Sequence, residues 1–329
     1  MPNLLLYIDK LEHWPDRYEN VLRERFPDIS LKLANSLEIA HETLEDTDIL
    51  VAYGESLSEQ FLSKTTRVQW IHNLATGMDW TVNLPVTDAG PILTSTRGVH
   101  GAPVSEITLM MMLALARDFV QFLHNQRQRV WQRLPSQLLE DKSVGILGVG
   151  SIAESLAPKC KAMGMKVVGF SATRKSVENF DHIYPRDKLK RIATELDFLV
   201  LLTPLSKKTQ HIIDMEVFRA MKPSAYLINV ARGGIVDEEA MIVALIEKEI
   251  AGAALDVFAT EPLPSDHPLW TMDNVIISPH SAGYYDSYVD KAAANILTEN
   301  VQHFLAGEIG QMVNRYDPKT MTYPYSIET

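Results

Sequence analysis

The sequence predicts an α/β protein in which helices cover parallel strands, organised in two domains. Through the first hundred residues, short apolar runs of strand length alternate with helix-spaced segments, which is the pattern of a parallel sheet. Residues 142–174 then read as a strand, a glycine-rich turn, a helix and a second strand. The chain has 329 residues, 46% of them hydrophobic and 22% charged, enough for a sizeable core in each domain.

The first segment supplies five predicted strands and one helix. The strands cover residues 4–8, 29–33, 49–52, 70–73 and 92–94, and the helix covers 16–25, before Pro27. Thr76 and Gly77 follow the fourth strand, where α/β sheets place ligands, and a glycine there lets backbone N–H groups point at an anion. A plain turn is the alternative, and spacing alone favours it.

A long apolar helix is predicted over residues 104–117. It is rich in Met, Leu and Ala and apolar nearly all round, so we expect it to be buried at a domain junction. Its continuous apolar run, residues 109–116, is too short to span a bilayer before Arg117.

The second half of the chain carries the remaining elements. Strands are predicted over residues 144–147, 166–170, 198–202, 225–230, 252–257 and 275–278, and helices from the glycine turn to 163 and over 214–221, 237–249 and 289–305. Asp214 is expected to cap its helix. The last helix can return the chain to the first domain, and no regular pattern follows from Asn314 onward.

The glycine-rich turn is a dinucleotide-binding fingerprint. Gly148, Gly150 and Ala153 form a G-x-G-x-x-A pattern between a strand and a helix, the context this motif requires. Gly148 permits the tight turn, Gly150 lets the backbone approach a pyrophosphate, and Ala153 lets the helix sit close on the strand. The helix N-terminus then faces the phosphates. The alternative is a glycine turn that binds nothing.

The end of the second strand indicates which cofactor binds. Chains that bind NAD usually carry Asp or Glu there, but this sequence has Ser171, Thr173 and Arg174 and no carboxylate. Ser171 and Thr173 can donate to a 2′-phosphate, and Arg174 can fork onto its oxygens or stack on adenine. We therefore predict that NADP(H) is preferred, with NAD(H) possible. The alternative is a solvated basic turn beside an NAD site.

The composition argues against two classes of partner. The formal net charge of -11 argues against non-specific binding to nucleic acid or to an anionic membrane, while a local cationic site still suits an anionic substrate. The single cysteine, Cys160, suits a reducing compartment and reads as buried filler. The sequence begins with a strand-like run rather than a leader. We expect a cytoplasmic protein without a metal site.

Three ionisable residues, Arg232, Glu261 and His280, each follow a predicted strand. The carboxyl ends of parallel strands meet at one edge of a sheet, where the cofactor also binds. Reduction of a 2-keto acid needs a cation to hold the carboxylate, a proton donor whose pKa lies near neutrality, and a carboxylate to keep that donor protonated. A surface ion pair, a turn residue and a capping histidine are the alternatives for each residue alone; the three together favour a catalytic site.

These motifs resemble those of the D-isomer-specific 2-hydroxyacid dehydrogenase family, and of its glyoxylate/hydroxypyruvate reductase-like members. The resemblance rests on Asn229-Val230-Ala231-Arg232-Gly233-Gly234-Ile235-Val236-Asp237, on Glu261-Pro262-Leu263-Pro264 and on Ser278-Pro279-His280-Ser281-Ala282-Gly283, in the family's order. It implies two doubly wound domains. Residues 1–98 plus 286–329 would form a flavodoxin-like substrate domain, and residues 99–285 an inserted Rossmann domain. It also implies a cleft between them and a homodimer formed through the nucleotide-binding domain.

The resemblance also implies roles for individual residues. Arg232 would bind the substrate carboxylate and carbonyl, His280 would be the acid/base with Glu261 as its partner, and the backbone of Thr76 and Gly77 would bind the carboxylate. The implied cofactor-binding set is Thr76, Gly148, Gly150, Ser151, Ile152, Ser171, Thr173, Arg174, Thr203, Pro204, Thr209, Val230, Ala231, Arg232, Asp256, His280, Ala282 and Gly283.

We therefore predict an oxidoreductase that transfers a hydride between NAD(P)H and the carbonyl of a small 2-keto acid, giving a D-2-hydroxy acid. Candidates for lining the pocket of the substrate side chain are Tyr53, Arg97, Val99 and His100. One alternative is a nucleotide-sensing module like the family's co-repressor members. Another is a phosphoglycerate- or phosphite-type dehydrogenase, and the lack of an appended regulatory domain in this sequence favours the keto acid reductase over the former.

Overall fold

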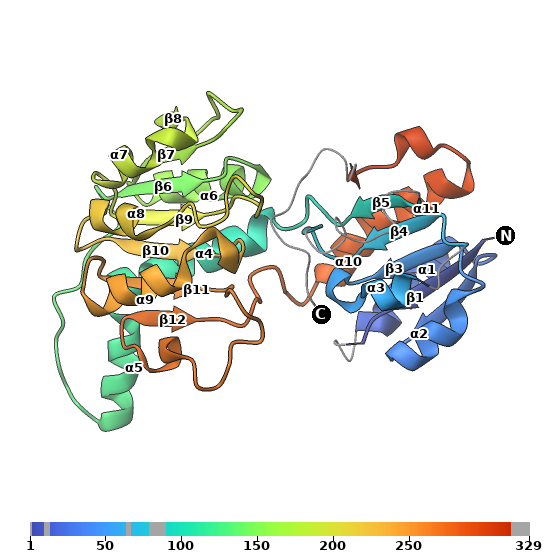
Figure 1. Cartoon of the computed structure of the whole chain (residues 1–329), viewed down its shortest axis with the longest axis horizontal. Helices are drawn as coiled ribbons and strands as arrows, with labels where there is room; N and C mark the ends of the chain where they lie inside the picture. The colour runs from blue at the N-terminus through green and yellow to red at the C-terminus, as the bar shows by residue number, and fades with distance from the viewer. Residues whose placement is uncertain (1, 10–13, 64–66, 79–89, 317–329) are drawn as a thin grey trace. The chain divides into compact units, whose positions relative to one another are not determined.

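The chain forms two compact units, each built around its own sheet (Figure 1). The computed structural model describes residues 2–9, 14–63, 67–78 and 90–316. Unit 1 comprises residues 1–99 and 285–329, and unit 2 comprises residues 100–284. The predicted domain limits differ from these by one residue at each junction. The predicted α/β class with two doubly wound, largely parallel sheets is confirmed.

Unit 1 is built from both ends of the chain. Its elements are β1 (Asn3–Tyr7), α1 (Trp14–Arg25), β2 (Ser30–Ala34), α2 (Leu37–Leu44), β3 (Ile49–Ala52), α3 (Glu59–Leu62), β4 (Trp70–Asn73), β5 (Ile92–Ser95), α10 (Tyr288–Ala292), α11 (Thr298–Leu305) and β13 (Arg315–Tyr316). The strand order is β13-β5-β4-β3-β1-β2, and only β13 runs antiparallel to its neighbour among the described strands. The five parallel strands have the order of flavodoxin-like sheets.

Alternating side chains of β1 divide the core of unit 1 into two layers. Leu4 and Leu6 pack in one cluster with α1 and the helices near the C-terminus, whereas Leu5 and Tyr7 pack in the other with α2 and α3. All four side chains are buried. A strand buried on both faces reads as a continuous apolar run, which is why the sequence revealed it.

Unit 2 has a seven-stranded parallel sheet. Its elements are α4 (Gly101–Ala116), α5 (Phe119–Gln128), β6 (Ser143–Leu147), α6 (Ser151–Ala162), β7 (Lys166–Phe170), β8 (His182–Tyr184), α7 (Leu189–Ala193), β9 (Phe198–Leu201), α8 (Met215–Ala220), β10 (Tyr226–Asn229), α9 (Glu238–Ile246), β11 (Gly252–Leu255) and β12 (Val275–Ile277). The order β8-β7-β6-β9-β10-β11-β12 is that of a Rossmann sheet with one added strand. From β6 the chain adds strands toward one edge of the sheet (β7, β8), and from β9 it adds them toward the other edge. A crevice for a nucleotide is expected where this order reverses, at the carboxyl ends of β6 and β9.

The sheet of unit 2 is also buried on both faces. Val144 and Ile146 pack with α4 and α6, while Leu147 packs with α7, α8 and α9 on the opposite face. Cys160 belongs to the first of these clusters and is fully buried, as predicted. Burial raises the pKa of its thiol to about 12, so it stays neutral and unreactive.

The sequence located most elements but not all of them. It did not identify the short elements α2, α3, α7 and β8, nor α5, and the predicted helix over 289–305 is α10 and α11 joined by a π-helical turn at Ala293–Leu297. The part of the terminal segment that the structure describes contains β13, which pairs with β5. Residues 317–329 lie outside the described residues.

The prediction that the long apolar helix is buried nearly all round is wrong for one face of α4. Val104, Met111 and Met112 are buried, but Met110 is 53% exposed. An apolar surface turned to solvent cannot be distinguished by pattern from one turned to the core. Among the described residues no single helix is long and apolar enough to cross a membrane, and α4 with α5, bent by 63°, is the one helix pair that passes on length and composition.

Candidate active site

The glycine turn after β6 has the shape that a dinucleotide requires. Gly148 has φ +104°, and a Cβ there would lie 2.5 Å from the backbone nitrogen of Thr203, so only glycine fits between β6 and β9. Nothing lies within 4 Å of the Cβ position at Gly150, which leaves room for a ligand. Gly150 also begins α6 without a side-chain cap, so the N–H groups at Ser151 and Ile152 can bind an anion.

The next turn of the chain, residues 171–174, follows β7. Ser171 Oγ accepts hydrogen bonds from the backbone nitrogens of Thr173 at 3.2 Å and Arg174 at 3.0 Å, so the hydroxyl folds this turn. The guanidinium of Arg174 forms an ion pair with Glu154, in the first turn of α6. Residues 171–174 contain no carboxylate, but the fold places the Glu154 carboxylate beside this turn.

The turn after β9 contains three of the predicted cofactor residues. Thr203 and Thr209 are buried, and Thr209 Oγ1 donates to the carbonyl of Pro204 at 2.7 Å. Arg186 Nη2 donates to Thr203 Oγ1 at 3.1 Å, and its buried Nε has no hydrogen-bond partner in the described chain. Burial lowers the pKa of Arg186. Arg186 was not among the predicted site residues, although it follows β8 as those residues follow their own strands.

In the turn after β10, Arg232 is held by Asn229, which was not among the predicted site residues. Asn229 Oδ1 accepts from the backbone nitrogen of Ala231 at 3.1 Å, and its Nδ2 donates to the carbonyl of Arg232 at 3.0 Å. A Cβ at Gly233 would lie 1.9 Å from the carbonyl carbon of Phe258. Only glycine therefore lets the turn that carries Arg232 press against the segment that leads to Glu261.

His280 and Glu261 form a direct pair. His280 Nδ1 lies 2.6 Å from Glu261 Oε2, and Glu261 Oε1 accepts from the backbone nitrogen of Phe258 at 2.9 Å. Both carboxylate oxygens of Glu261 are therefore held. With Nδ1 committed to the carboxylate, Nε2 of His280 is the ring nitrogen that can exchange a proton with a ligand.

The electrostatics of this pair favour a protonated imidazole. The hydrogen bond that His280 donates to Glu261 raises the pKa of His280, and this effect outweighs partial burial and the nearby charge of Arg232. Burial pushes the pKa of Glu261 upward, but the bond to His280, the Phe258 N–H and the charge of Arg232 outweigh it and lower the pKa. Both shifts favour an ionised carboxylate beside an imidazolium, and the charge of Arg232 acts on both groups.

A buried aspartate fixes the backbone around His280. Asp256 Oδ1 accepts from Ser278 Oγ at 2.5 Å and from the backbone nitrogen of Ser281 at 2.9 Å, and Oδ2 accepts from that of Ala282 at 3.0 Å. His280 itself has φ +50°, a left-handed conformation that costs a non-glycine residue about 1–3 kcal/mol. The bonds to Asp256 hold this conformation in place. Asp256 therefore acts as a positioning residue in this structure.

His100, one of the predicted pocket residues, lies close to this site within unit 2. Burial first, and then the charge of Arg232, lowers the pKa of His100 to about 4, so its imidazole is neutral at pH 7. The Cβ position at Gly283 lies 2.9 Å from His100 Cδ2, so the lack of a side chain at Gly283 makes room for the ring.

Thr76 and Gly77 belong to unit 1 and lie just after β4. Asn73, the last residue of β4, accepts from the backbone nitrogen of Ala75 at 3.0 Å and donates to the carbonyl of Gly77 at 2.6 Å. Asn229 in unit 2 also accepts from the backbone nitrogen two residues later and donates to a carbonyl of the same turn. Tyr53, Arg97 and Val99 also belong to unit 1.

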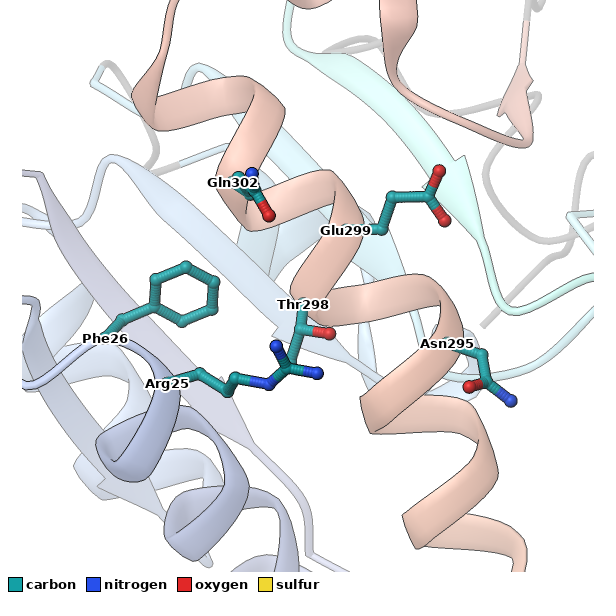
Figure 2. Close-up of a pocket in the computed structure, with 6 residues that line it drawn as sticks. All are labelled: Arg25, Phe26, Asn295, Thr298, Glu299 and Gln302. Carbon is teal, nitrogen blue, oxygen red and sulfur yellow. The ribbon is translucent and has the colours of Figure 1, made fainter.

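One hollow among the described residues is lined by no predicted site residue. A hollow in unit 1 lies between the end of α1 and α11 (Figure 2) and is lined by Arg25, Phe26, Asn295, Thr298, Glu299 and Gln302. Within the described ranges, no three His, Cys, Asp or Glu side chains are grouped so that they could hold a metal ion.

Arg232, Glu261 and His280 follow β10, β11 and β12 in the chain, as predicted, and His280 contacts Glu261 directly. The sequence did not reveal Asn73, Asn229, Ser278 or Arg186. A signal existed for the two asparagines, because each ends a strand two residues before a backbone nitrogen that it binds. Chemically, the arrangement can hold an anion beside Arg232 and deliver a proton from His280 Nε2.

Nearly all of unit 2 matches a known family model. Residues 109–282 match the D-isomer specific 2-hydroxyacid dehydrogenase, NAD binding domain. A glyoxylate reductase of Pyrococcus furiosus is 33% identical over 82% of this chain and 82% of that protein. A D-3-phosphoglycerate dehydrogenase of Methanocaldococcus jannaschii is 34% identical over 83% of this chain. The chain spans about half the length of the latter, 52%.

Solved structures share the whole fold. A D-isomer specific 2-hydroxyacid dehydrogenase family protein from Aeromonas salmonicida is 30% identical, with a TM-score of 0.88 over 97% of this chain and all of that one. An enzyme of the family from Xanthobacter autotrophicus Py2, in complex with NADPH, is 26% identical with a TM-score of 0.80, covering 97% and 99% of the two chains.

A D-lactate dehydrogenase from Aquifex aeolicus, complexed with NAD and lactic acid, is also 26% identical, with a TM-score of 0.82 over 95% and 98% of the two chains. Related structures thus hold either nicotinamide cofactor. The matched region contains the glycine turn, Arg232, Glu261 and His280. The chain belongs to the D-isomer-specific 2-hydroxyacid dehydrogenase family.

Proposed function

We propose that this oxidoreductase reduces a small 2-keto acid such as glyoxylate or hydroxypyruvate to the D-2-hydroxy acid, with NADPH preferred over NADH. The observation that carries the proposal is the 2.6 Å pair of His280 and Glu261, held on the sheet edge that also carries Arg232 and the uncapped start of α6. The likeness to glyoxylate reductases supports a short keto acid as substrate.

Each residue has a distinct part in the mechanism. Arg232 holds the substrate carboxylate and stabilises the negative charge that develops on the carbonyl oxygen. Protonated His280 gives the proton on Nε2 to that oxygen, and Glu261 keeps the imidazole charged and oriented until it does. Asp256 keeps the backbone at His280 in its left-handed conformation.

The residues at the glycine turn fit a nicotinamide dinucleotide. The N–H groups at the start of α6 would hold the pyrophosphate, and the turn at Ser171–Arg174 would hold the adenosine ribose and its 2′-phosphate. When bound, the cofactor supplies the hydride for the carbonyl carbon. His100, which is neutral, lies against Gly283, and His280, whose backbone is left-handed, comes three residues before Gly283 in the chain.

Initial rates test the proposed function directly. NADPH and NADH oxidation would be measured side by side with glyoxylate, hydroxypyruvate, pyruvate and a branched 2-keto acid, and oxidation of 3-phosphoglycerate would be measured with both oxidised cofactors. We expect the highest rate with NADPH and one of the two-carbon or three-carbon acids. Turnover of 3-phosphoglycerate alone, or of none of the acids while cofactor still binds, would contradict the proposal.

Replacing Arg174 with glutamine is expected to weaken NADPH binding by about ten- to a hundredfold, the worth of a hydrogen bond to a charged group. NADH binding should change by about twofold or less, because NADH has no 2′-phosphate. Dissociation constants from quenching of protein fluorescence provide the measurement. Arg191→Gln, which removes an exposed arginine of α7, is the matched control. An equal effect on both cofactors would remove the phosphate assignment.

We also propose that the protein is a homodimer formed through α4, α5 and the segment that follows. Large apolar side chains are exposed along this stretch: Met110 53%, Phe119 51%, Phe122 38%, Leu123 40%, Val130 50%, Trp131 96% and Leu138 56%. So much exposed apolar surface in one stretch is typical of an interface.

The double substitution Phe122→Arg with Trp131→Arg is expected to halve the mass in solution, from twice the 37.0 kDa chain mass to the single chain. Buried charge opposes association at an apolar interface. Light scattering after size exclusion measures the mass. Ile246→Arg, at a 65% exposed position on α9, should leave the mass unchanged. A monomeric native protein would overturn the proposed dimer.

A further inference from the structure

Arg174 has an anionic partner within the chain. Its guanidinium forms an ion pair with the carboxylate of Glu154, and the side chains are 48% and 39% exposed. The two residues are 20 positions apart and come from different elements, Glu154 from the first turn of α6 and Arg174 from the turn after β7. The pair therefore lies at the turn to which a 2′-phosphate is assigned above.

Glu154 is held on the helix side of this pair. Glu154 lies in the first turn of α6, where the helix dipole stabilises a negative charge. We therefore expect its carboxylate to keep its position when the Arg174 side chain moves. The backbone of Arg174 is held as well, because its nitrogen donates to Ser171 Oγ at 3.0 Å. The guanidinium is thus the part of the pair that can change partner.

A 2′-phosphate and Glu154 would compete for the same guanidinium. A phosphate monoester carries a charge of about -1.5 to -2 at pH 7, so it can displace an exposed carboxylate from an arginine. The displaced carboxylate remains a few ångströms from where the guanidinium was, and it repels the phosphate that replaces it. A ribose 2′-OH carries no charge, so it meets no such repulsion.

We propose that Glu154 narrows the preference of this enzyme for NADP(H), because it competes for Arg174 and so weakens NADP(H) binding relative to NAD(H) binding. The inference rests on the proposed function, because it requires Arg174 to bind the 2′-phosphate. The enzyme then discriminates less between the two cofactors than the basic turn alone would.

The test measures binding of adenosine fragments, which isolates this end of the site from catalysis. Dissociation constants for 2′,5′-ADP and for 5′-ADP would be measured by calorimetry on the native protein and on Glu154→Gln. We expect Glu154→Gln to tighten 2′,5′-ADP about three- to tenfold and NADPH by a similar factor, and to change 5′-ADP and NADH by about twofold or less. In the Arg174→Gln background the gain should shrink, because the competition for the guanidinium is gone.

Glu216→Gln is the matched control. Glu216 is also an exposed glutamate of unit 2 in an ion pair, with Lys190 at 2.6 Å, so this variant makes the same change in net charge. It should leave both fragments unaffected. Glu154→Ala serves as a second variant, since it cannot hydrogen-bond to Arg174 as glutamine can.

The outcomes separate this inference from the proposed function. Unchanged or weaker binding of 2′,5′-ADP to both Glu154 variants, with normal fragment binding to the native protein, would overturn the competitor role and leave the reductase intact. Equal binding of 2′,5′-ADP and 5′-ADP to the native protein and to Arg174→Gln would overturn the phosphate assignment itself. Failure of the native protein to bind either fragment would overturn both.

Discussion

Replacing His280 with alanine is expected to lower kcat for keto acid reduction by about 10²- to 10⁴-fold, the usual contribution of a positioned general acid. Its Nδ1 is fixed on Glu261 at 2.6 Å, which leaves Nε2 as the proton donor, and alanine offers no replacement. The dissociation constant of NADPH should change little, because the glycine turn and the start of α6 are untouched. Steady-state kinetics at saturating cofactor and fluorescence titration measure the two quantities.

The control for this substitution is His303→Ala. His303 makes the same kind of pair, with its Nδ1 3.0 Å from Glu308 Oε2, but it lies in the last turn of α11 in unit 1. Its loss should leave kcat near the native value. A native kcat in His280→Ala would contradict the role of His280 as the general acid.

The pH dependence of reduction gives a second readout of the same pair. Reduction needs protonated His280, so the rate should fall as pH rises through the pKa of His280, which Glu261 raises above its usual value. Glu261→Gln removes the main cause of that shift, and the fall in rate should move to lower pH. Any stability that protonated His280 gains from Glu261 has the same sign: it is present at low pH and is lost as pH rises through the raised pKa. A profile that does not move in Glu261→Gln would contradict the coupling.

The fold was predictable where local chemistry decides it. Strands buried on both faces appear as apolar runs, and β7 was placed at its observed ends. The aspartate cap was also local, since Asp214 accepts from the backbone nitrogen of Val217 at 3.0 Å as a capping residue should. Short elements such as α2 and β8 were missed because so few residues produce no clear period, and their stability comes from packing on the rest of the unit.

The candidate site was predictable only in part, for a related reason. A rule about the carboxyl ends of parallel strands locates Arg232, Glu261 and His280 without knowledge of contacts. The partners that position these residues come from elsewhere in the chain: Asp256 binds backbone nitrogens 25 and 26 positions away. The Arg174 turn was judged from its own residues, whereas the carboxylate that it meets, Glu154, comes from the preceding helix.

Gly233→Ala is expected to be among the most damaging single substitutions in the chain. The added Cβ would lie 1.9 Å from the carbonyl carbon and 2.0 Å from the carbonyl oxygen of Phe258, and both are backbone atoms that cannot move alone. Overpacking of this kind costs about 1–3 kcal/mol or more in the free energy of unfolding. Urea denaturation measures that loss, with Gly310→Ala as the control because nothing lies within 4 Å of its Cβ position.

The same substitution should also remove activity beyond its effect on stability. Relief of the clash has to separate the turn that carries Arg232 from the segment at Phe258, whose backbone nitrogen binds Glu261. Glu261 in turn holds His280, so one methyl group disturbs all three residues of the site. Measured on the folded fraction at low temperature, kcat should still be at least about a hundredfold below native, since small misplacements at a reacting centre have effects of that size. Native kcat in a folded Gly233→Ala protein would show that the close approach at Phe258 serves packing alone.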